Sequence, residues 1–142
     1  MNEEEYLKER LEDQIKYYEQ KSKQNKICYL VLQSLVLTLS ASIPLLSGFN
    51  NSYNLNIMIG VIGFLVVAFE SIILLFKYRD NWVNYRTTAE TIKHEKYLFL
   101  TKSGLYKNGN SFDNFVERIE NLISTENTKW IQYINKEHKS KK

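Results

Sequence analysis

Between residues 27 and 76 the chain carries a single charged side chain, the carboxylate of Glu70. Two apolar runs fill this stretch, residues 27–46 and 55–76, and residues 47–54 connect them. Each run is close to or above the roughly 20 residues that a helix needs to cross a hydrocarbon core of about 30 Å. Charged residues make up 25% of the whole sequence, so their near absence here separates the runs from polar arms. The pattern predicts an all-α membrane protein built on a two-helix transmembrane hairpin.

Basic residues that flank the two runs predict their orientation. The connection between the runs is uncharged, and an excess of lysine and arginine near membrane-spanning helices marks the cytoplasmic side. A secretory signal peptide is the alternative for the first run, but the 26 residues before it are too long and too acidic for one. We therefore expect a multi-pass protein with both termini in the cytoplasm. The flanking basic residues are Lys16, Lys21, Lys23 and Lys26 before the first run, and Lys77, Arg79, Arg86 and Lys93 after the second.

The polar arms have the apolar spacing of amphipathic helices, at residues 1–26, 77–100 and 111–137. The second run continues into the second arm without glycine or proline, so one uninterrupted helix is expected over residues 55–100. The three arms would close a cytoplasmic three-helix bundle continuous with the hairpin, and residues 1–142 would form a single domain. Their apolar faces are Tyr6, Leu7, Leu11, Ile15 and Tyr18, then Tyr78, Trp82, Tyr85, Ala89, Ile92 and Phe99, then Phe112, Val116, Ile119, Ile123, Trp130 and Ile134.

The short connection forces the two runs to pair antiparallel, and counting inward from their cytoplasmic ends places Glu70 opposite Gln33. Both residues lie in stripes with four- and three-residue spacing, which is the heptad pattern of helix pairing. Small residues in such stripes let helices approach closely in lipid. The predicted seam is therefore Gln33, Leu37, Ser40 and Pro44 on the first helix, and Asn56, Gly60, Gly63, Val67, Glu70 and Leu74 on the second.

An ionisable residue inside an apolar span is costly, which makes Glu70 a candidate functional residue. It has three interpretations: a clamp to Gln33 that sets the hairpin pairing, a pore-facing or proton-sensitive group, or a side chain that reaches toward the headgroups. Ser34 and Thr38 form a second polar stripe on the first run, rotated from Gln33. A lone hairpin can bury only one of these two stripes, which favours a homo-oligomer over a monomer.

Enzyme chemistry finds little support in the sequence. There is no glycine-rich phosphate loop, and neither His94 nor His138 has a plausible nucleophile as a partner. His94 and Glu90 have the spacing of metal ligands on a helix, but a metal site needs three or four ligands. No basic face with interleaved aromatic side chains indicates nucleic-acid binding. We therefore expect a protein that is not an enzyme, without metal, cofactor or nucleic acid.

Four further predictions concern single residues. Cys28 lies where a cysteine can be palmitoylated, although a lone cysteine is usually a small buried hydrophobic residue. Gly104 is expected to end the second arm in the left-handed conformation, and Asn110 to cap the last helix. Arg86 and Glu90 lie four residues apart on one helical face, where they can form an ion pair.

Past the second run, several motifs carry a family likeness. In order they are W-x-x-Y-R-x-x-A-E, which contains Trp82, Tyr85, Arg86, Ala89 and Glu90, then G-L-Y from Gly104 to Tyr106, and a late Trp130. With the two apolar runs before them, these motifs resemble the bacterial SLATT families, which overlap a family described as a domain of unknown function. SLATT domains are two-span effectors that associate with SMODS nucleotidyltransferases and SLOG nucleotide sensors. Leu105 departs from the pattern, because proline is common there.

The resemblance implies an effector of bacterial nucleotide-dependent conflict and anti-phage systems in the inner (cytoplasmic) membrane. Such effectors are proposed to oligomerise and to form a pore or perturb the membrane. Besides the lipid bilayer, the implied partner is a separately encoded nucleotide-signalling or sensor protein, because this sequence contains no such domain. The alternative is a passive membrane anchor or scaffold whose cytoplasmic bundle recruits a partner protein.

Overall fold

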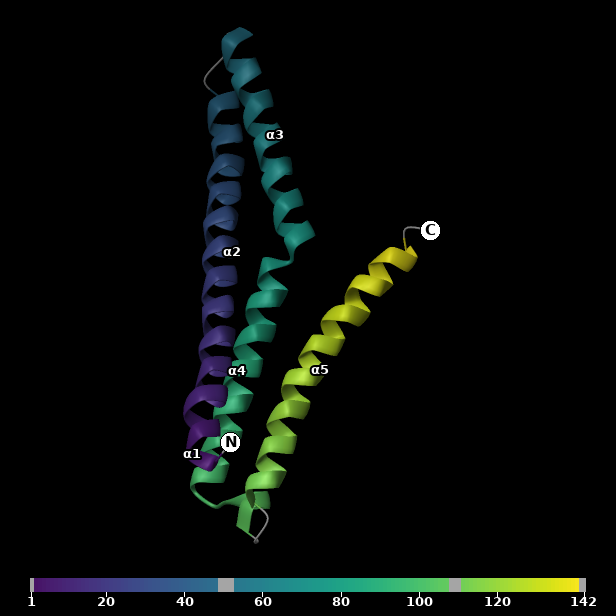
Figure 1. The fold of residues 1–142 in the computed structure, drawn as a ribbon. Helices are drawn as coiled ribbons and strands as arrows, with labels where there is room; N and C mark the ends of the chain where they lie inside the picture. Colours follow the sequence, from purple (N-terminus) through teal and green to yellow (C-terminus); the bar gives the residue numbers. More distant parts are fainter. Residues whose placement is uncertain (1, 49–52, 108–110, 141–142) are drawn as a thin grey trace. The chain divides into compact units, whose positions relative to one another are not determined.

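In the computed structural model, residues 2–48, 53–107 and 111–140 are described, with the backbone alone at residues 53, 111, 127 and 129–140. Within these ranges every regular element is a helix, so the all-α fold class is confirmed. In chain order the elements are α1 (Glu3–Glu5), the π-helix η1 (Tyr6–Leu11), α2 (Glu12–Ser47), α3 (Tyr53–Phe76), α4 (Tyr78–Leu100), the 3-10 helix η2 (Gly104–Lys107) and α5 (Ser111–Ser140) (Figure 1).

The chain divides into two compact units. Met1–Glu19 and Tyr85–Lys142 form the first, here called the bundle, and Gln20–Asn84 forms the second, here called the hairpin unit. The helices α2 and α4 each contribute residues to both units.

The N-terminal helix begins with a capping box. The Asn2 side chain accepts a hydrogen bond from the Glu5 backbone N–H (2.8 Å), and the Glu5 carboxylate accepts one from the Asn2 backbone N–H (3.2 Å). These two bonds satisfy donors that a helix start leaves without partners. The following π-helix widens the turn, because its bonds run from i to i+5. As a result Tyr6 and Leu11, five residues apart, are both buried.

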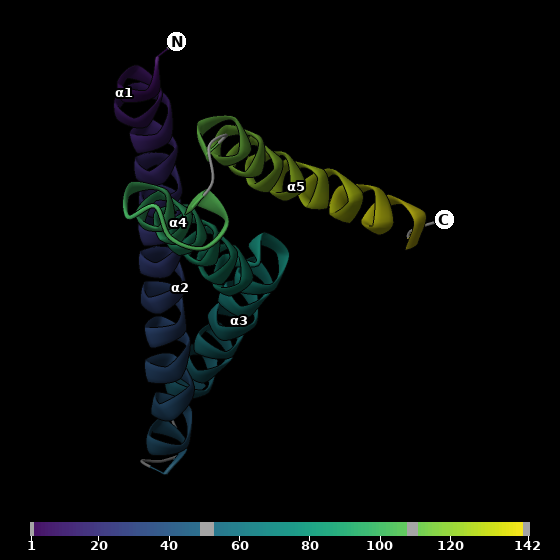
Figure 2. The same cartoon turned by 90° about the horizontal axis from the view of Figure 1, so that it is seen from below.

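The core of the bundle comes from three long helical segments and from Tyr106 of η2. Its buried residues confirm the predicted faces at the N-terminus, in α4 and in the first half of α5. Seen from below, α1, the end of α4 and the first turns of α5 surround one region (Figure 2). Phe115 and Phe99 stack at its centre, with ring centroids 4.4 Å apart. The buried apolar residues are Tyr6, Leu11, Ile15, Tyr18, Ala89, Ile92, Phe99, Tyr106, Phe115, Ile119 and Ile123.

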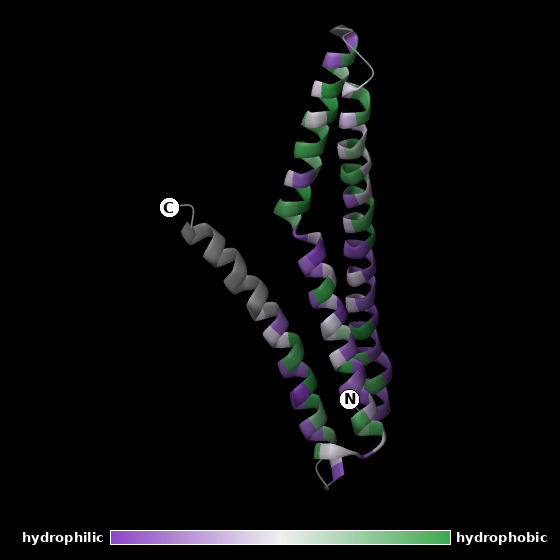
Figure 3. Cartoon of the chain, turned by 180° about the vertical axis from the view of Figure 1, so that it is seen from behind, coloured by the Kyte–Doolittle hydropathy of each residue, from purple (hydrophilic) through white to green (hydrophobic). Residues whose placement is uncertain are grey.

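In the hairpin unit, α3 lies antiparallel beside the second half of α2 (Figure 1). Hydrophobic residues cover α3 and the neighbouring part of α2 (Figure 3). The buried and half-buried positions of each helix follow four- and three-residue steps, the spacing of a heptad seam. This seam consists of Ser22, Asn25, Tyr29, Leu32, Val36, Leu39, Ile43 and Leu46 on α2, and Leu55, Ile59, Ile62, Val66, Phe69 and Ile73 on α3.

The uninterrupted helix predicted from residue 55 to residue 100 is broken at Lys77. This residue has a φ of 48°, in the left-handed region that side chains other than glycine rarely adopt. The Asn81 side chain stabilises the break, because its amide donates to the backbone carbonyl of Phe76 (3.0 Å). The rings of Phe76 and Tyr78 stack on either side of it, 5.5 Å apart. The sequence gives no sign of this break, because the residue in the left-handed conformation is a lysine rather than a glycine or a proline.

Lys102, and not Gly104, ends α4 in the left-handed conformation. The backbone N–H of Ser103 donates to the carbonyl of Leu98 (2.9 Å), and that of Lys102 to the carbonyl of Phe99 (3.0 Å), with a φ of 50° at Lys102. These two bonds form a Schellman motif, in which the left-handed residue is usually glycine. Gly104 also has a positive φ, 62°, but it lies two residues later, at the start of η2. The predicted cap Asn110 lies outside the described residues.

Candidate functional site

The helix pairing of the hairpin differs from the predicted seam by about one residue. On α3 the predicted positions Asn56, Gly60, Val67 and Leu74 are exposed, and the positions directly before them are half-buried. One residue corresponds to about 100° of helical rotation, so the predicted stripe lies beside the real seam rather than in it. On α2, Leu37, Ser40 and Pro44 are likewise exposed, and Gln33 is half-buried.

Glu70 does not clamp Gln33. Its side chain is exposed, and among the residues that the structure describes no hydrogen bond or ion pair reaches it. The two seam glycines do not mediate a close helix approach either, because a Cβ built on Gly60 or Gly63 meets nothing within 4 Å. The seam is filled by larger aliphatic and aromatic side chains, which make more packing contacts with one another than glycine can.

Glu70 and several hydroxyl groups lie on the outward face of the hairpin, among exposed apolar side chains. Three of its hydroxyls donate within their own helix, for example Thr38 to the carbonyl of Ser34 (2.8 Å) and Ser71 to that of Val67 (2.7 Å). Such bonds satisfy the hydroxyl without a partner helix. Glu70 has no comparable internal donor among the described residues. Cys28 is also exposed, contrary to the expectation of a small buried side chain.

Trp82 packs against α2 at the end of the apolar seam. The Lys26 ammonium lies 5.5 Å from the centroid of its ring, and the ring of Tyr29 lies 6.5 Å away. The Ser22 hydroxyl donates to the backbone carbonyl of Trp82 (3.3 Å), and Ser22 is buried. The polar segment of α2 before the first apolar run is thus held by a cation–π contact, a ring contact and a hydrogen bond.

A buried carboxylate, Glu95, joins three elements of the bundle. Its side chain is only 6% exposed, accepts a hydrogen bond from the Tyr106 hydroxyl of η2 (2.7 Å) and forms an ion pair with the Arg118 guanidinium of α5 (2.8 Å). Both carboxylate oxygens are therefore satisfied, as a buried charge requires. The Arg118 side chain is 50% exposed, so water screens its charge and the contribution of the ion pair to stability is modest.

This environment raises the pKa of Tyr106 to about 12. Burial of the phenol is the largest cause, and its hydrogen bond to Glu95 and the negative charge of that carboxylate add to it. The positive charge of Arg118 acts in the opposite direction. Tyr106 is therefore a neutral hydrogen-bond donor over the whole physiological range.

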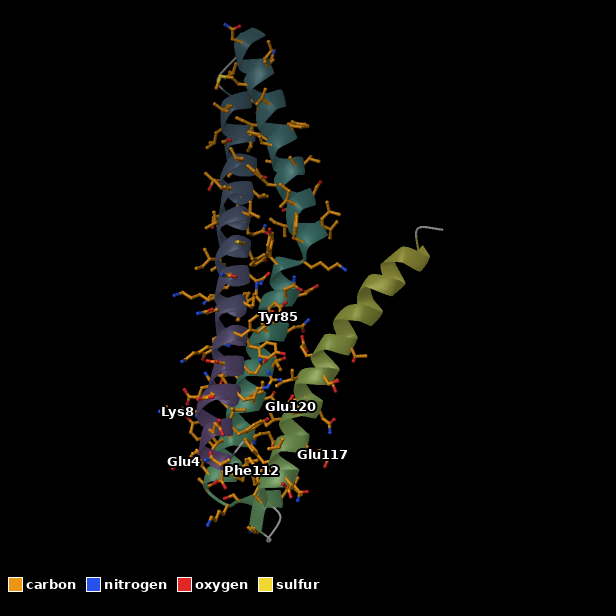
Figure 4. The ribbon with its side chains drawn as sticks, in the orientation of Figure 1. Glu4, Lys8, Tyr85, Phe112, Glu117 and Glu120 are labelled. Carbon is orange, nitrogen blue, oxygen red and sulfur yellow. The ribbon has the colours of Figure 1, made fainter. Side chains whose placement is uncertain are left out.

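A second carboxylate, Glu120, joins α5 to η1. It accepts hydrogen bonds from the Tyr6 hydroxyl (3.1 Å) and from two guanidinium nitrogens of Arg10 (3.1 and 3.3 Å). The hydrogen bond from Arg10 is the main reason that the pKa of Glu120 is lowered. Phe112 and Glu120 point toward the other helices of the bundle, whereas Glu117 points away (Figure 4). Between α2 and α4, Glu12 pairs with Lys96 (2.7 Å).

The motif residues have different surroundings. Tyr85 is half-buried against Tyr18 (6.1 Å between ring centroids), and Tyr106 is buried. Arg86 and Glu90 are exposed, and Glu90 contacts Lys93 (3.5 Å) rather than forming the expected pair with Arg86. The side chain of Trp130 lies outside the described residues. In the described parts of the chain, no three His, Cys, Asp or Glu side chains gather where a metal ion could bind.

Sequence reasoning missed Glu95, Arg118 and the Arg10–Glu120 pair. A signal for Glu95 was present, because it lies three residues after Ile92 and four before Phe99, inside the apolar stripe of α4. A carboxylate at such a position must find buried donors. The partners of Arg10 and Arg118 could not be found in this way, because both arginines occupy polar positions of amphipathic helices.

The fold and site define an all-helical protein with two helices long and apolar enough to cross a membrane, and a small bundle that contains one buried carboxylate, Glu95, among the described residues. A family model described as "Protein of unknown function (DUF4231)" matches residues 13–113, and the chain belongs to this family. The match includes both apolar helices, α4 and η2. Searches among curated proteins and among solved structures found no match.

Proposed function

We propose that the chain is an integral membrane protein inserted through its hairpin unit. The observation that carries this proposal is the exposure of large apolar side chains on both helices of the hairpin. Among the apolar residues described there, Val36 is the one classed as buried. A core helix of a soluble protein would be buried, and soluble monomers rarely expose apolar patches beyond a few hundred Å². The exposed residues include Leu30, Val31, Leu35, Leu37, Leu45, Ile57, Met58, Val61, Phe64, Val67, Leu74 and Leu75.

The aromatic and basic residues at one end of the hairpin support its orientation. Trp82, Tyr78 and Tyr29 lie where the apolar seam gives way to polar residues, and such rings favour the headgroup level. The basic flanks lie on the same side, whereas the connection between α2 and α3 is uncharged. Both termini are therefore proposed to lie in the cytoplasm of a bacterial cell.

Labelling with a membrane-impermeant maleimide tests this topology. In a Cys28→Ser background, Ser47→Cys at the end of α2 is expected to react in intact cells, because it lies at the outer end of the hairpin. Glu4→Cys in α1 is expected to react only after the membrane is permeabilised. Both positions are exposed in the structure, so their reactivities form a matched pair. Labelling of Glu4→Cys in intact cells would contradict the orientation.

Within the membrane we propose an oligomeric effector that forms a pore or perturbs the bilayer. Glu70 supports this function, because it lies on the outward face without an internal partner among the described residues. A carboxylate facing lipid costs on the order of 2–3 kcal/mol, whereas one facing a second copy or water does not. The likeness to SLATT effectors is a second support, and it also suggests a separately encoded nucleotide-signalling or sensor partner.

The second candidate is a passive anchor whose bundle recruits a partner protein. The bundle supports this second candidate. Its hydrophobic core and the contacts of Glu95 and Glu120 form a compact unit that is separate from the hairpin unit. If the protein is such an anchor, Glu70 has no role in its function, and the hairpin does not change the permeability of the membrane.

Inducible expression with a voltage-sensitive dye separates the two functions. The effector is expected to depolarise cells rapidly after induction, and Glu70→Gln is expected to slow or abolish this effect, because it removes the charge that faces the pore. Ser71→Ala is the matched control: it removes a neighbouring polar group on the exposed face whose hydroxyl is satisfied within its helix. Unchanged membrane potential with normal expression and insertion would support the anchor instead.

A further inference from the structure

The break at Lys77 lies where the helical phase changes between α3 and α4. Along α3 the seam advances in steps of three or four residues and ends at Ile73. Beyond Ile73 the half-buried positions are Lys77, Tyr78, Asn81 and Trp82. Among these, Trp82 contacts Ser22, Lys26 and Tyr29 of α2, and Tyr78 lies one turn before it. The step from Ile73 to this contacting face is therefore five residues, from Ile73 to Tyr78. On the facing helix the seam of α2 has no such irregular step, because it continues with steps of three and four from Ser22 to Leu46.

A five-residue step cannot be accommodated by an unbroken helix. At about 100° per residue, five residues rotate the side chain by about 140° beyond one full turn. Without the left-handed residue, an α4 continuous with α3 would turn Asp80 and Asn84 toward α2 in place of Trp82. Both residues are exposed in the structure. The left-handed Lys77 therefore returns the aromatic face of α4 to the seam.

We propose that Lys77 is a rotary switch between two states of the hairpin unit. In the broken state, Trp82 packs against Tyr29 and Lys26. In the straight state, Lys77 joins a continuous helix, the start of α4 rotates by about 140°, and Trp82 leaves these contacts.

Three features make both states accessible. A left-handed lysine is strained, which favours the straight state. The Asn81–Phe76 hydrogen bond and the Phe76–Tyr78 stack favour the broken state. The sequence around the break contains neither glycine nor proline, so nothing in it prevents a helix from running through.

The proposal makes opposite predictions for two changes at one residue. Lys77→Ile disfavours the left-handed conformation, because β-branched residues are strongly excluded from it, and is expected to expose Trp82. Deletion of Lys77 shortens the step from Ile73 to Tyr78 to four residues, which restores the heptad in an unbroken helix. The deletion is therefore expected to keep Trp82 protected.

The exposure of Trp82 is measured by its fluorescence in the full chain. All variants also carry Trp130→Phe, so that Trp82 is the one tryptophan that remains. In mild detergent, Lys77→Ile should shift the emission to longer wavelength and increase quenching by acrylamide, and the Lys77 deletion should do neither. Lys102→Ile replaces the other left-handed lysine as a control, and deletion of Ser71 is a control that shifts the phase of α3. Helix content by circular dichroism identifies variants that fail to fold.

Two results would overturn the proposal. One is protection of Trp82 in a folded Lys77→Ile variant that equals its protection in the parent chain. The other is an exposure of Trp82 in the Lys77 deletion that equals its exposure in the Ser71 deletion. This second comparison can be made even if Lys77→Ile fails to fold. Neither measurement depends on pore formation.

Discussion

Replacing Phe115 with alanine is expected to lower the free energy of unfolding of the bundle by about 4 kcal/mol, within the range for large aromatic residues in cores. The side chain is fully buried. It stacks on Phe99 with ring centroids 4.4 Å apart and makes edge contacts with Tyr6 (6.3 Å) and Tyr106 (5.9 Å). The substitution removes contacts with η1, α4 and η2 and leaves a cavity that these elements cannot all close.

Chemical denaturation followed by near-ultraviolet circular dichroism measures this change. Tyr97→Ala is the matched control, because Tyr97 is also an aromatic residue of the bundle but is 64% exposed. Its effect is expected to stay within about 0.5 kcal/mol, as for surface substitutions in general. Equal losses in the two variants would mean that Phe115 is not at the centre of the core.

The bundle could be predicted because its information is local. Apolar residues at three- and four-residue spacing define one face of a helix, and Tyr6, Leu11, Ile92 and Ile119 lie on the faces that were predicted. The burial of these faces requires only that the helices meet. The π-helix at Tyr6–Leu11 was not predicted, because five-residue bonding has no signature in this sequence.

The hairpin could be predicted as a pair of apolar helices, but its rotation could not. Nearly every position of the second run is apolar, so periodicity does not distinguish the face of Ile59 and Phe69 from that of Gly60 and Glu70. The predicted seam is the stripe with small and polar residues, because such residues are common between helices in lipid. In the structure the larger side chains pair instead, and Glu70 lies on the outward face.

The break at Lys77 and the Glu95 clamp show a further limit of sequence reasoning. The left-handed conformation of Lys77 follows from tertiary packing, because α3 and α4 must both turn their packing faces toward α2. The local helix propensity of lysine opposes this conformation. For Glu95, the missing information was the identity of its donors. Tyr106 and Arg118 approach it only after the chain has turned back through η2 and α5.

Raising the pH above 10 is expected to destabilise the bundle through Tyr106. The ordinary pKa of tyrosine is about 10, and in the folded chain the pKa of Tyr106 is raised to about 12. Because the folded value is the higher one, its contribution is fully present below pH 10 and is lost as the pH rises toward 12. At about 1.4 kcal/mol per pH unit, the loss amounts to roughly 3 kcal/mol.

Tyr106→Phe isolates this contribution. The pKa of Tyr6, Tyr18 and Tyr85 is also raised, mainly by burial, so some alkaline loss is expected in every variant. The difference between the parent chain and Tyr106→Phe, measured as the free energy of unfolding from neutral pH to pH 12, reports Tyr106 alone.

Glu95→Gln provides a second test of the cause. It removes the negative charge beside the phenol but keeps an oxygen that can accept its hydrogen bond. The hydrogen bond to Glu95 and the negative charge of that carboxylate both raise the pKa of Tyr106. The ultraviolet titration of Tyr106 is therefore expected to move to lower pH in Glu95→Gln than in the parent chain. Burial is the larger cause, so the pKa of Tyr106 should remain above 10 in the variant. A titration unchanged by Glu95→Gln would show that the carboxylate does not contribute, and would leave Tyr106 bound to Glu95 without an electrostatic role.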